Sequence, residues 1–277
     1  MKKEYFVDER SIVRQIWGRS DTILFIFAGA AAEFALNKSV DWLYFTGRLP
    51  ADPVGRLFST VSYARAIVFS EKQTAWRTID AMTQIHAQVE AKRGTRIPDQ
   101  AYRDVLFMLT DYSIRAFEVL EHKLGLAEKK EVFDVFNRLG NRMGLRGLPR
   151  SFEAWQTMRK AHLQQNLQYS EYTNHLFAQY RKHLGGMRYR LLLEVQACIM
   201  PGHVRNLLGF HKVSFLYPVV VCYRASRVVK LDGFLKSLIL PARYRQAILA
   251  LDKQLDKQPA KRSAPHDSLP GRYSHSF

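Results

Sequence analysis

Apolar residues recur along the chain at the spacings of three and four that place them on one face of a helix. No long run alternates apolar with polar residues, as a half-buried strand would. Glycine and proline stand mainly at the ends of the periodic segments. The pattern predicts an all-α protein, with helices over residues 22–37, 53–69, 71–92, 98–125, 127–139, 152–168, 171–184, 188–199 and 219–229.

The helix over residues 53–69 and the one after it have clear end signals. Asp52 followed by proline is typical of an N-cap and a first helical residue. Ser70 and Gln73 have the spacing of a capping box for the next helix, and Gly94 can end that helix in the left-handed conformation. Because only a short turn near Ser70 joins the two helices, we expect them to pack antiparallel.

Helix signals continue without an internal repeat or a linker as far as about Gln258. From Pro259 onward the composition changes to proline, serine, glycine, arginine and histidine, which is typical of a disordered segment. The sequence therefore predicts a single multi-helix domain over residues 1–258 and a disordered C-terminal tail over residues 259–277.

Basic residues exceed acidic ones by 42 to 25, which gives a net charge of +17. Such an excess calls for an anionic partner: nucleic acid, a membrane surface, or an anionic cofactor or substrate. No nucleic acid is expected, because there is no basic run interleaved with aromatic residues. The most apolar run, residues 23–32, is shorter than the roughly 20 residues that span a bilayer, and it predicts a buried helix. Peripheral membrane contact stays open.

Cys198 and Cys222 are isolated, without C-x-x-C, C-x-x-C-H or paired Cys/His spacing. Thiolate zinc sites and c-type haem are therefore not expected. Two lone thiols are typical of core residues in a cytosolic protein. We expect a cytoplasmic or membrane-peripheral location, and the sequence gives no indication of the oligomeric state.

Arg56 is unusual because nearly every position of the helix over residues 53–69 is apolar and none is acidic. Arg65 follows nine positions later, about half a turn around the helix, and is expected on the opposite side. A buried guanidinium is costly unless it meets an anion or a polarised ligand. Arg56 is therefore expected either to pair with a distant carboxylate such as Glu33 or to face a ligand.

A histidine lies in the middle of the apolar stripe of the next helix, which consists of Ala75, Ile79, Met82, His86 and Val89. A lone histidine on an apolar face is most often a core residue bonded to a backbone carbonyl, and metal ligation is the commonest alternative. The preceding helix places Arg56, Thr60 and Tyr63 at i, i+4 and i+7. We expect that stripe to face His86.

Several familiar catalytic patterns are absent from the sequence. No histidine follows a glutamate by three positions, which excludes a di-iron carboxylate bundle, and there is no H-E-x-x-H, G-x-x-x-x-G-K-[ST], G-x-S-x-G or G-x-G-x-x-G. Glu118 with His122, and Glu171 with His175, are expected to be exposed helix pairs. One histidine, one arginine and one threonine remain, and this set suits a haem pocket.

A resemblance extends this interpretation. The motif R-L-x-x-T at residues 56–60, followed about thirty residues later by I-H-x-x-V at residues 85–89, resembles the MpaB-type oxygenases and latex-clearing proteins, the family of the rubber oxygenase catalytic domain. The likeness covers roughly residues 12–210. It implies an all-helical fold with the globin-like helical core of the latex-clearing proteins. It also implies a bound haem b and the use of dioxygen to cleave carbon–carbon double bonds of isoprenoid chains.

Carried over by position, the resemblance makes His86 the proximal ligand of the haem iron and Arg56 and Thr60 the distal residues. Two features depart from it. Rubber-cleaving members have a lysine immediately before the distal threonine, where this chain has Ser59. The histidine that the family has in the next helix is missing here. The catalytic carboxylate of the rubber-cleaving enzymes has no match in the sequence; Asp41 and Asp52 are acidic residues close to the motif but do not align with it.

The leading hypothesis is a haem b-dependent oxygenase that acts with dioxygen on an apolar substrate of isoprenoid or lipid-like type. His86 would hold the iron, and Arg56 and Thr60 would orient and polarise dioxygen. The alternative is a non-catalytic basic helical protein that binds an anionic membrane surface, a lipid or an acidic partner.

Overall fold

The computed structural model describes residues 3–45 and 51–211 of the chain. Their regular secondary structure is helical apart from two isolated β-bridges, Tyr5 with Glu71 and Asn37 with Leu167. This confirms the all-α prediction. The helices are α1 Ile12–Gly18, α2 Ser20–Phe34, α3 Asp41–Phe45, α5 Pro53–Phe69, α6 Lys72–Arg93, α7 Asp99–Leu120, α8 Leu126–Arg142, α9 Phe152–Gln165, α10 Glu171–Ile199 and α11 Gly202–Leu207.

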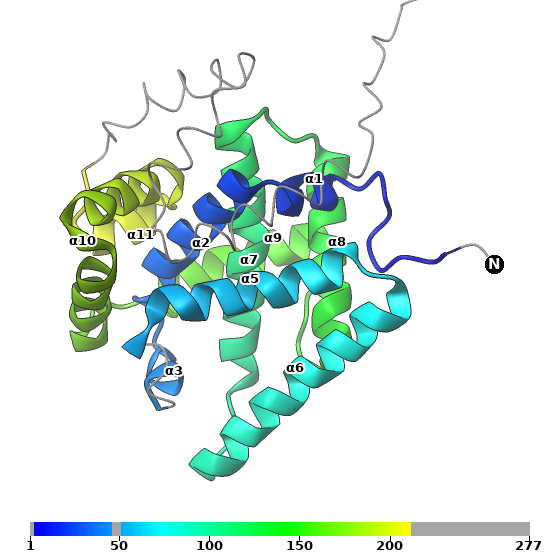
Figure 1. Ribbon diagram of the computed structural model, residues 1–277, viewed down its shortest axis with the longest axis horizontal. Coiled ribbons are helices and arrows are strands. Elements are labelled where there is room, and N and C mark those ends of the chain that lie inside the picture. Colours follow the sequence, from blue (N-terminus) through cyan, green and yellow to red (C-terminus); the bar gives the residue numbers. More distant parts are fainter. Residues whose placement is uncertain (1–2, 46–50, 212–277) are drawn as a thin grey trace, which may run out of the picture.

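Helix α7 runs through the middle of the molecule, with α2 and α5 across it, α10 on one side and α8 on the other (Figure 1). The apolar run predicted as a buried helix lies in α2, where Ile23 and Ile26 are fully buried. Helix α2 approaches α7 closely at Gly29, since a Cβ there would lie 2.3 Å from a ring carbon of Tyr112. Glycine at this position lets the two central helices pack against each other.

The predicted ends of α5 and α6 are right except for one cap. Asp52 caps α5 through a 2.9 Å hydrogen bond from the Gly55 N–H, and Gly94 ends α6 with a φ of 72°. The capping box predicted at Ser70 does not form, because α6 begins at Lys72 and has no side-chain cap. Instead, the Lys72 N–H donates to the Glu4 carbonyl at 2.8 Å. A segment distant in sequence thus satisfies a donor at the start of the helix.

Helix α7 ends at Leu120, earlier than the predicted residue 125. The Glu118 carboxylate accepts the Leu124 N–H at 3.2 Å, which fixes the chain after the helix in a turn. The two helices predicted over residues 171–184 and 188–199 form the single element α10, which is kinked at Gly185 with φ 74°. Left-handed backbone of this kind favours glycine.

Two predictions lie outside the described residues: the helix over residues 219–229 and the tail over residues 259–277. None of the helices in the described ranges is long and apolar enough to cross a membrane.

Candidate functional site

The start of α5 carries Arg56 and Thr60. Gly55 is required beside them, since a Cβ at that position would lie 2.2 Å from a carboxylate oxygen of Asp52 and displace the cap. The Thr60 hydroxyl donates to the Arg56 carbonyl at 3.1 Å, so its proton is bound within the helix. Both side chains are half-buried. Helix α5 thus presents a cation and a hydroxyl oxygen on one stripe.

His86 lies on α6, two turns before the end of that helix. Its stripe is buried at Ala75 and Ile79 and becomes half-buried at Met82, His86 and Val89. The Nδ1 atom of His86 is buried, and the Met82 carbonyl, one turn earlier in α6, is the backbone acceptor for the ring. A core histidine bonded to a backbone carbonyl would have this contact, so the structure is compatible with that interpretation as well as with a ligand.

The imidazole of His86 is held in its neutral form. Burial lowers its pKa, and the positive charge of Arg56 lowers it further, whereas the Met82 carbonyl one turn earlier raises it. Helices α5 and α6 diverge from the turn at Ser70 (Figure 1), so they are splayed rather than closely antiparallel. The charge of Arg56 nevertheless reaches His86. A neutral imidazole is the form that binds metal ions.

Tyr102 of α7 completes the surroundings of His86. The two rings meet edge to face, with centroids 5.2 Å apart. The Tyr102 hydroxyl donates to Glu90 at 3.2 Å, and the same carboxylate oxygen accepts the Ile97 N–H at 3.0 Å. Burial and the charge of Glu90 raise the pKa of the Tyr102 phenol. Glu90, one turn beyond His86, therefore fixes the α6–α7 loop and the ring beside the histidine.

A second contact ties α3 to the end of α6. Arg93 pairs with Asp41 at 2.7 Å and stacks on Trp42, 3.9 Å from the ring centroid. Asp41, one of the two acids near the predicted site, is therefore engaged with an arginine, and Asp52 is engaged as the α5 cap. Both acids have roles that hold the elements around His86 in place.

Two expectations about Arg56 are corrected. Arg65, expected on the opposite side of α5, is the more buried arginine of the helix and donates to the Trp17 carbonyl at 2.9 Å. Arg56 is only half-buried. Glu33, suggested as a partner for Arg56, is instead held by Arg159 through both carboxylate oxygens.

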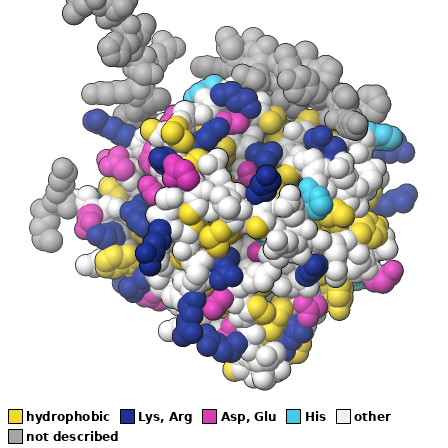
Figure 2. All heavy atoms as spheres, turned by 180° about the vertical axis from the view of Figure 1, so that it is seen from behind, with side chains coloured by type: hydrophobic (Ala, Val, Ile, Leu, Met, Phe, Trp, Pro, Cys, Tyr) yellow, Lys and Arg dark blue, Asp and Glu magenta, His cyan; other side chains and the backbone are white. Residues whose placement is uncertain are grey.

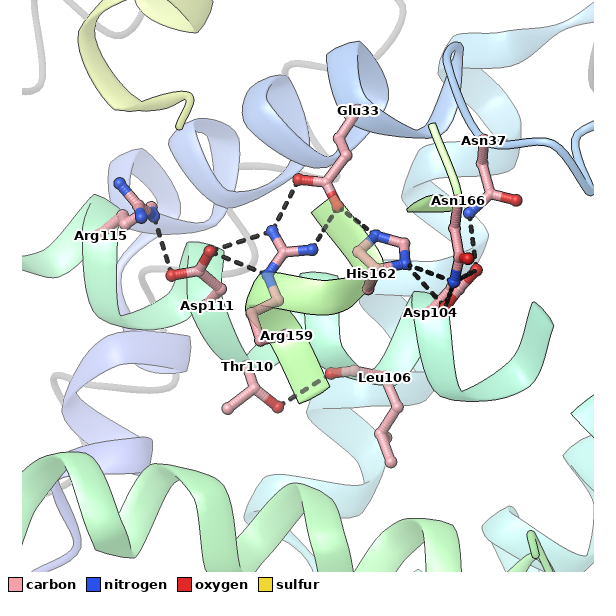
Figure 3. Close-up of polar contacts among 10 residues, drawn as sticks. All are labelled: Glu33, Asn37, Asp104, Leu106, Thr110, Asp111, Arg115, Arg159, His162 and Asn166. Atoms are coloured by element: carbon pink, nitrogen blue, oxygen red, sulfur yellow. Dashed lines mark hydrogen bonds and ion pairs between the residues drawn. The ribbon is translucent and has the colours of Figure 1, made fainter. Parts of the chain in front are cut away.

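Glu33 belongs to a buried charge network that joins α2, α7 and α9 (Figure 3). The network consists of Glu33, Asp104, Asp111, Arg159 and His162. Arg159 also donates to Asp111 at 3.0 Å, while Nε2 of His162 lies 2.9 Å from Glu33 and Nδ1 lies 2.7 Å from Asp104. Asn37 and Asn166 donate to Asp104 at 3.1 and 3.0 Å. Every charge in the network thus has an opposite charge beside it.

The protonation of the network follows from its geometry. Burial alone would raise the pKa of Glu33, but Arg159 and His162 lower it to about 2. Burial alone would lower the pKa of His162, but hydrogen bonds to Asp104 and Glu33 raise it. A carboxylate lies beside each ring nitrogen of His162, and this arrangement favours the imidazolium form.

The sequence contained signals of this network. Glu33 interrupts the most apolar stretch of the chain, Asp104 and Asp111 lie seven apart on one face of α7, and Arg159 and His162 lie three apart on α9. These spacings show which charged residues share one face of a helix, but not which residues of other helices they pair with.

The two expected exposed pairs of carboxylate and histidine do not form. Glu118 bonds Lys123 and Lys129 at 3.1 and 2.8 Å, and His122 packs edge-on against Phe117. His175 accepts or donates a hydrogen bond with the Tyr44 hydroxyl at 3.0 Å. Among the described residues, no group of three or more histidine, cysteine and carboxylate side chains could hold a metal ion. A metal held by His86 alone would therefore need its remaining ligands from a cofactor.

Comparison with protein families gives one match, to the family described as "ER-bound oxygenase mpaB/B'/Rubber oxygenase, catalytic domain". The match spans residues 15–229, well over half of the chain, and includes both the Arg56 and the His86 motifs. The chain belongs to this family. No curated protein and no solved structure matches it. The resemblance seen in the sequence is thereby confirmed, and the protein is assigned to an oxygenase catalytic-domain family.

The residues around His86 fit a haem in their donor chemistry. His86 supplies an imidazole whose lowered pKa favours the neutral, metal-binding form. A single protein ligand is sufficient for b-type haem, because the porphyrin supplies four more. Basic residues could also meet the propionates, although in Figure 2 they are spread over the surface among acidic ones and form no single basic face in that view.

Proposed function

We propose that the protein is a haem b-dependent oxygenase that acts with dioxygen on an apolar substrate of isoprenoid or lipid-like type. One observation carries the proposal: a half-buried histidine, whose pKa is lowered by burial and by the charge of Arg56, lies on the apolar stripe of α6 in a member of an oxygenase family. His86 is the proposed iron ligand, and Arg56 and Thr60 are the proposed distal residues.

Haem, when bound, supplies an iron with an open position at which dioxygen is activated. His86 contributes one neutral nitrogen to it. The ring of His86 has a backbone hydrogen bond to the Met82 carbonyl, one turn earlier in α6. The nitrogen that makes this bond would hold the proton, and the other nitrogen would be left for the metal.

Arg56 would place a guanidinium where negative charge develops as dioxygen is reduced. Its charge has a second effect, because it helps to keep His86 unprotonated. Thr60 donates to the backbone of its own helix, so it presents its oxygen lone pairs and its methyl group. Donation by Thr60 to a ligand would require its hydroxyl to turn away from the Arg56 carbonyl.

Ser59 alters the chemistry relative to rubber-cleaving members. A lysine in that place could cap the iron, whereas a serine is too short and too weak a base to do so. We therefore expect that Ser59 would not act as a ligand to a bound haem.

The absorption spectrum of protein purified from haem-replete cells tests the proposal. We expect a Soret band in the wild-type protein and a strong reduction of haem content in His86→Ala. His203→Ala is the matched control, because His203 is exposed on α11 and its loss should leave the haem content unchanged. If His86→Ala retains full haem with the same spectrum, the ligand assignment is wrong.

A colourless wild-type protein that stays free of haem under supplementation would contradict the proposal. Salt-sensitive sedimentation of that colourless protein with anionic vesicles would favour the alternative, a basic helical protein that binds an anionic surface.

A further inference from the structure

A groove of about 790 Å³ lies along α10 at its kink. This volume is within the roughly 300–1,000 Å³ typical of small-molecule sites. Its wall is largely aromatic and aliphatic, made by Phe177, Tyr189, Leu193, Leu208 and Phe210. Phe210, which follows α11, meets Phe177 edge to face with ring centroids 6.3 Å apart. Two segments of the chain thus build one apolar wall.

The kink shapes this groove. Gly185 breaks α10 with φ 74°, and Gly186, which has no side chain, lines the groove directly after it. Residues before the break, such as Phe177, and residues after it, such as Tyr189, therefore line the same hollow. A straight helix would distribute these side chains along one axis instead.

Two cations, Arg181 and Lys182, line the groove with the apolar wall. Both are exposed, and neither forms an ion pair with another described residue. Burial raises the pKa of the Tyr189 phenol and the charge of Arg181 lowers it, so the guanidinium lies near a ring of the wall. The sequence from 181 to 190 has four basic residues and no acidic one. The groove therefore joins an apolar surface to two cations, and no acidic residue is among the described residues that line it.

We infer that this α10 groove binds a single-chain anionic amphiphile, free in solution, with its hydrocarbon chain on the wall and its carboxylate at Arg181 and Lys182. The apolar wall would accept any hydrocarbon chain, whereas the two cations select an anionic head group. None of the residues that line the groove belongs to α5 or α6, so the site is separate from His86 and its test does not depend on haem.

Calorimetric titration of the full-length protein with dodecanoate below its micellar concentration tests the inference. We expect saturable binding at one site, and roughly tenfold weaker binding to the double variant Arg181→Gln, Lys182→Gln, because two charge-assisted contacts are lost. Arg190→Gln is the matched control: it removes one exposed charge from the same helix at a position outside the groove and should bind dodecanoate as the wild type does.

Dodecyltrimethylammonium carries the same chain with the opposite charge, and we expect it to bind at least tenfold more weakly than dodecanoate. Equal binding of the two amphiphiles, or an unchanged affinity in the double variant, would overturn the inference. The absence of saturable binding would also overturn it and would favour an occupant from the chain itself, such as the apolar run over residues 215–223. Binding to anionic vesicles but not to monomeric dodecanoate would reassign the surface to a membrane.

Discussion

The buried charge network and the surroundings of His86 are opposite solutions to the placement of polar groups inside a helical protein. In the network, Glu33, Arg159 and His162 are almost fully buried and each has hydrogen-bond partners. His86 is half-buried, and the backbone acceptor for its ring is the Met82 carbonyl of its own helix. The network joins side chains of three helices, whereas the hydrogen bond of His86 stays within α6. A network closed between three helices points to architecture, and a histidine bonded only to its own helix can still bind a ligand.

The pKa values of the two histidines are shifted in opposite directions. His162 lies between two carboxylates, and its pKa is raised. His86 lies near Arg56 in an apolar stripe, and its pKa is lowered. The surroundings thus favour the charged form of His162 and the neutral form of His86, which is the form that binds metal ions.

The largest expected effect comes from breaking the network. Glu33→Gln removes the charge that faces both Arg159 and His162, and we expect a loss of about 3–5 kcal/mol in the free energy of unfolding, because a buried cation loses its partner. Urea denaturation monitored by circular dichroism measures this change.

The exposed pair Arg142 with Asp80 provides the control for that variant. Both side chains are more than two-fifths exposed, so Arg142→Met should leave the denaturation midpoint unchanged. A Glu33→Gln protein as stable as the wild type would show that the network contributes nothing to architecture, and the comparison with His86 would lose its basis.

The pH dependence of stability provides the second test. His162 has a folded-state pKa above its ordinary value of 6.5, so the native protein keeps this proton when the unfolded chain releases it. The stabilisation is complete below pH 6.5 and is lost as the pH rises through the folded-state value. Stability should therefore fall with a slope of at most about 1.4 kcal/mol per pH unit from this one group.

His162→Gln should remove that component of the pH profile. Denaturation at a series of pH values from neutral upward, for both proteins, gives the difference. If the two profiles run parallel, His162 does not hold an extra proton in the folded protein, and the imidazolium assigned from its two carboxylate partners is wrong.

The third test compares the two histidines directly. His86→Leu removes one hydrogen bond within α6, and we expect the haem-free protein to lose at most about 1 kcal/mol in stability. The same substitution at position 162 should destabilise the protein much more, because it leaves the Glu33 and Asp104 carboxylates short of a donor. A clearly larger loss at position 162, measured by urea denaturation, would sharpen the comparison; equal losses would mean that His86 has a structural role.

Much of the helical framework could be predicted from the sequence because its signals are local. Asp52 and Gly94 mark ends of α5 and α6 through contacts within a few residues. His86 was found by its spacing within one helix. The start of α6 was misplaced because its donor is satisfied by Glu4, far away in the sequence.

The network escaped prediction for the same physical reason. Glu33 and Arg159 are 126 residues apart, and only the folded arrangement of α2, α7 and α9 brings them together. The partner of Arg65, the Trp17 carbonyl, lies 48 residues earlier and likewise could not be read from the sequence. Charges inside apolar helices could be recognised from the sequence as requiring partners, but the partners themselves are a property of the tertiary fold.

The smallest expected effect tests whether Arg56 and His86 belong to one site. Burial is the larger cause of the lowered pKa of His86, and the charge of Arg56 is the next. Arg56→Met should therefore raise the pKa of His86 toward its ordinary value without restoring it, and Arg56→Lys should keep it low because the charge remains. Titration of the His86 ring signals by NMR in haem-free protein measures both variants. An identical pKa in wild type and Arg56→Met would separate the two residues, and the α5 stripe would then have no electrostatic influence on the histidine that it is proposed to face.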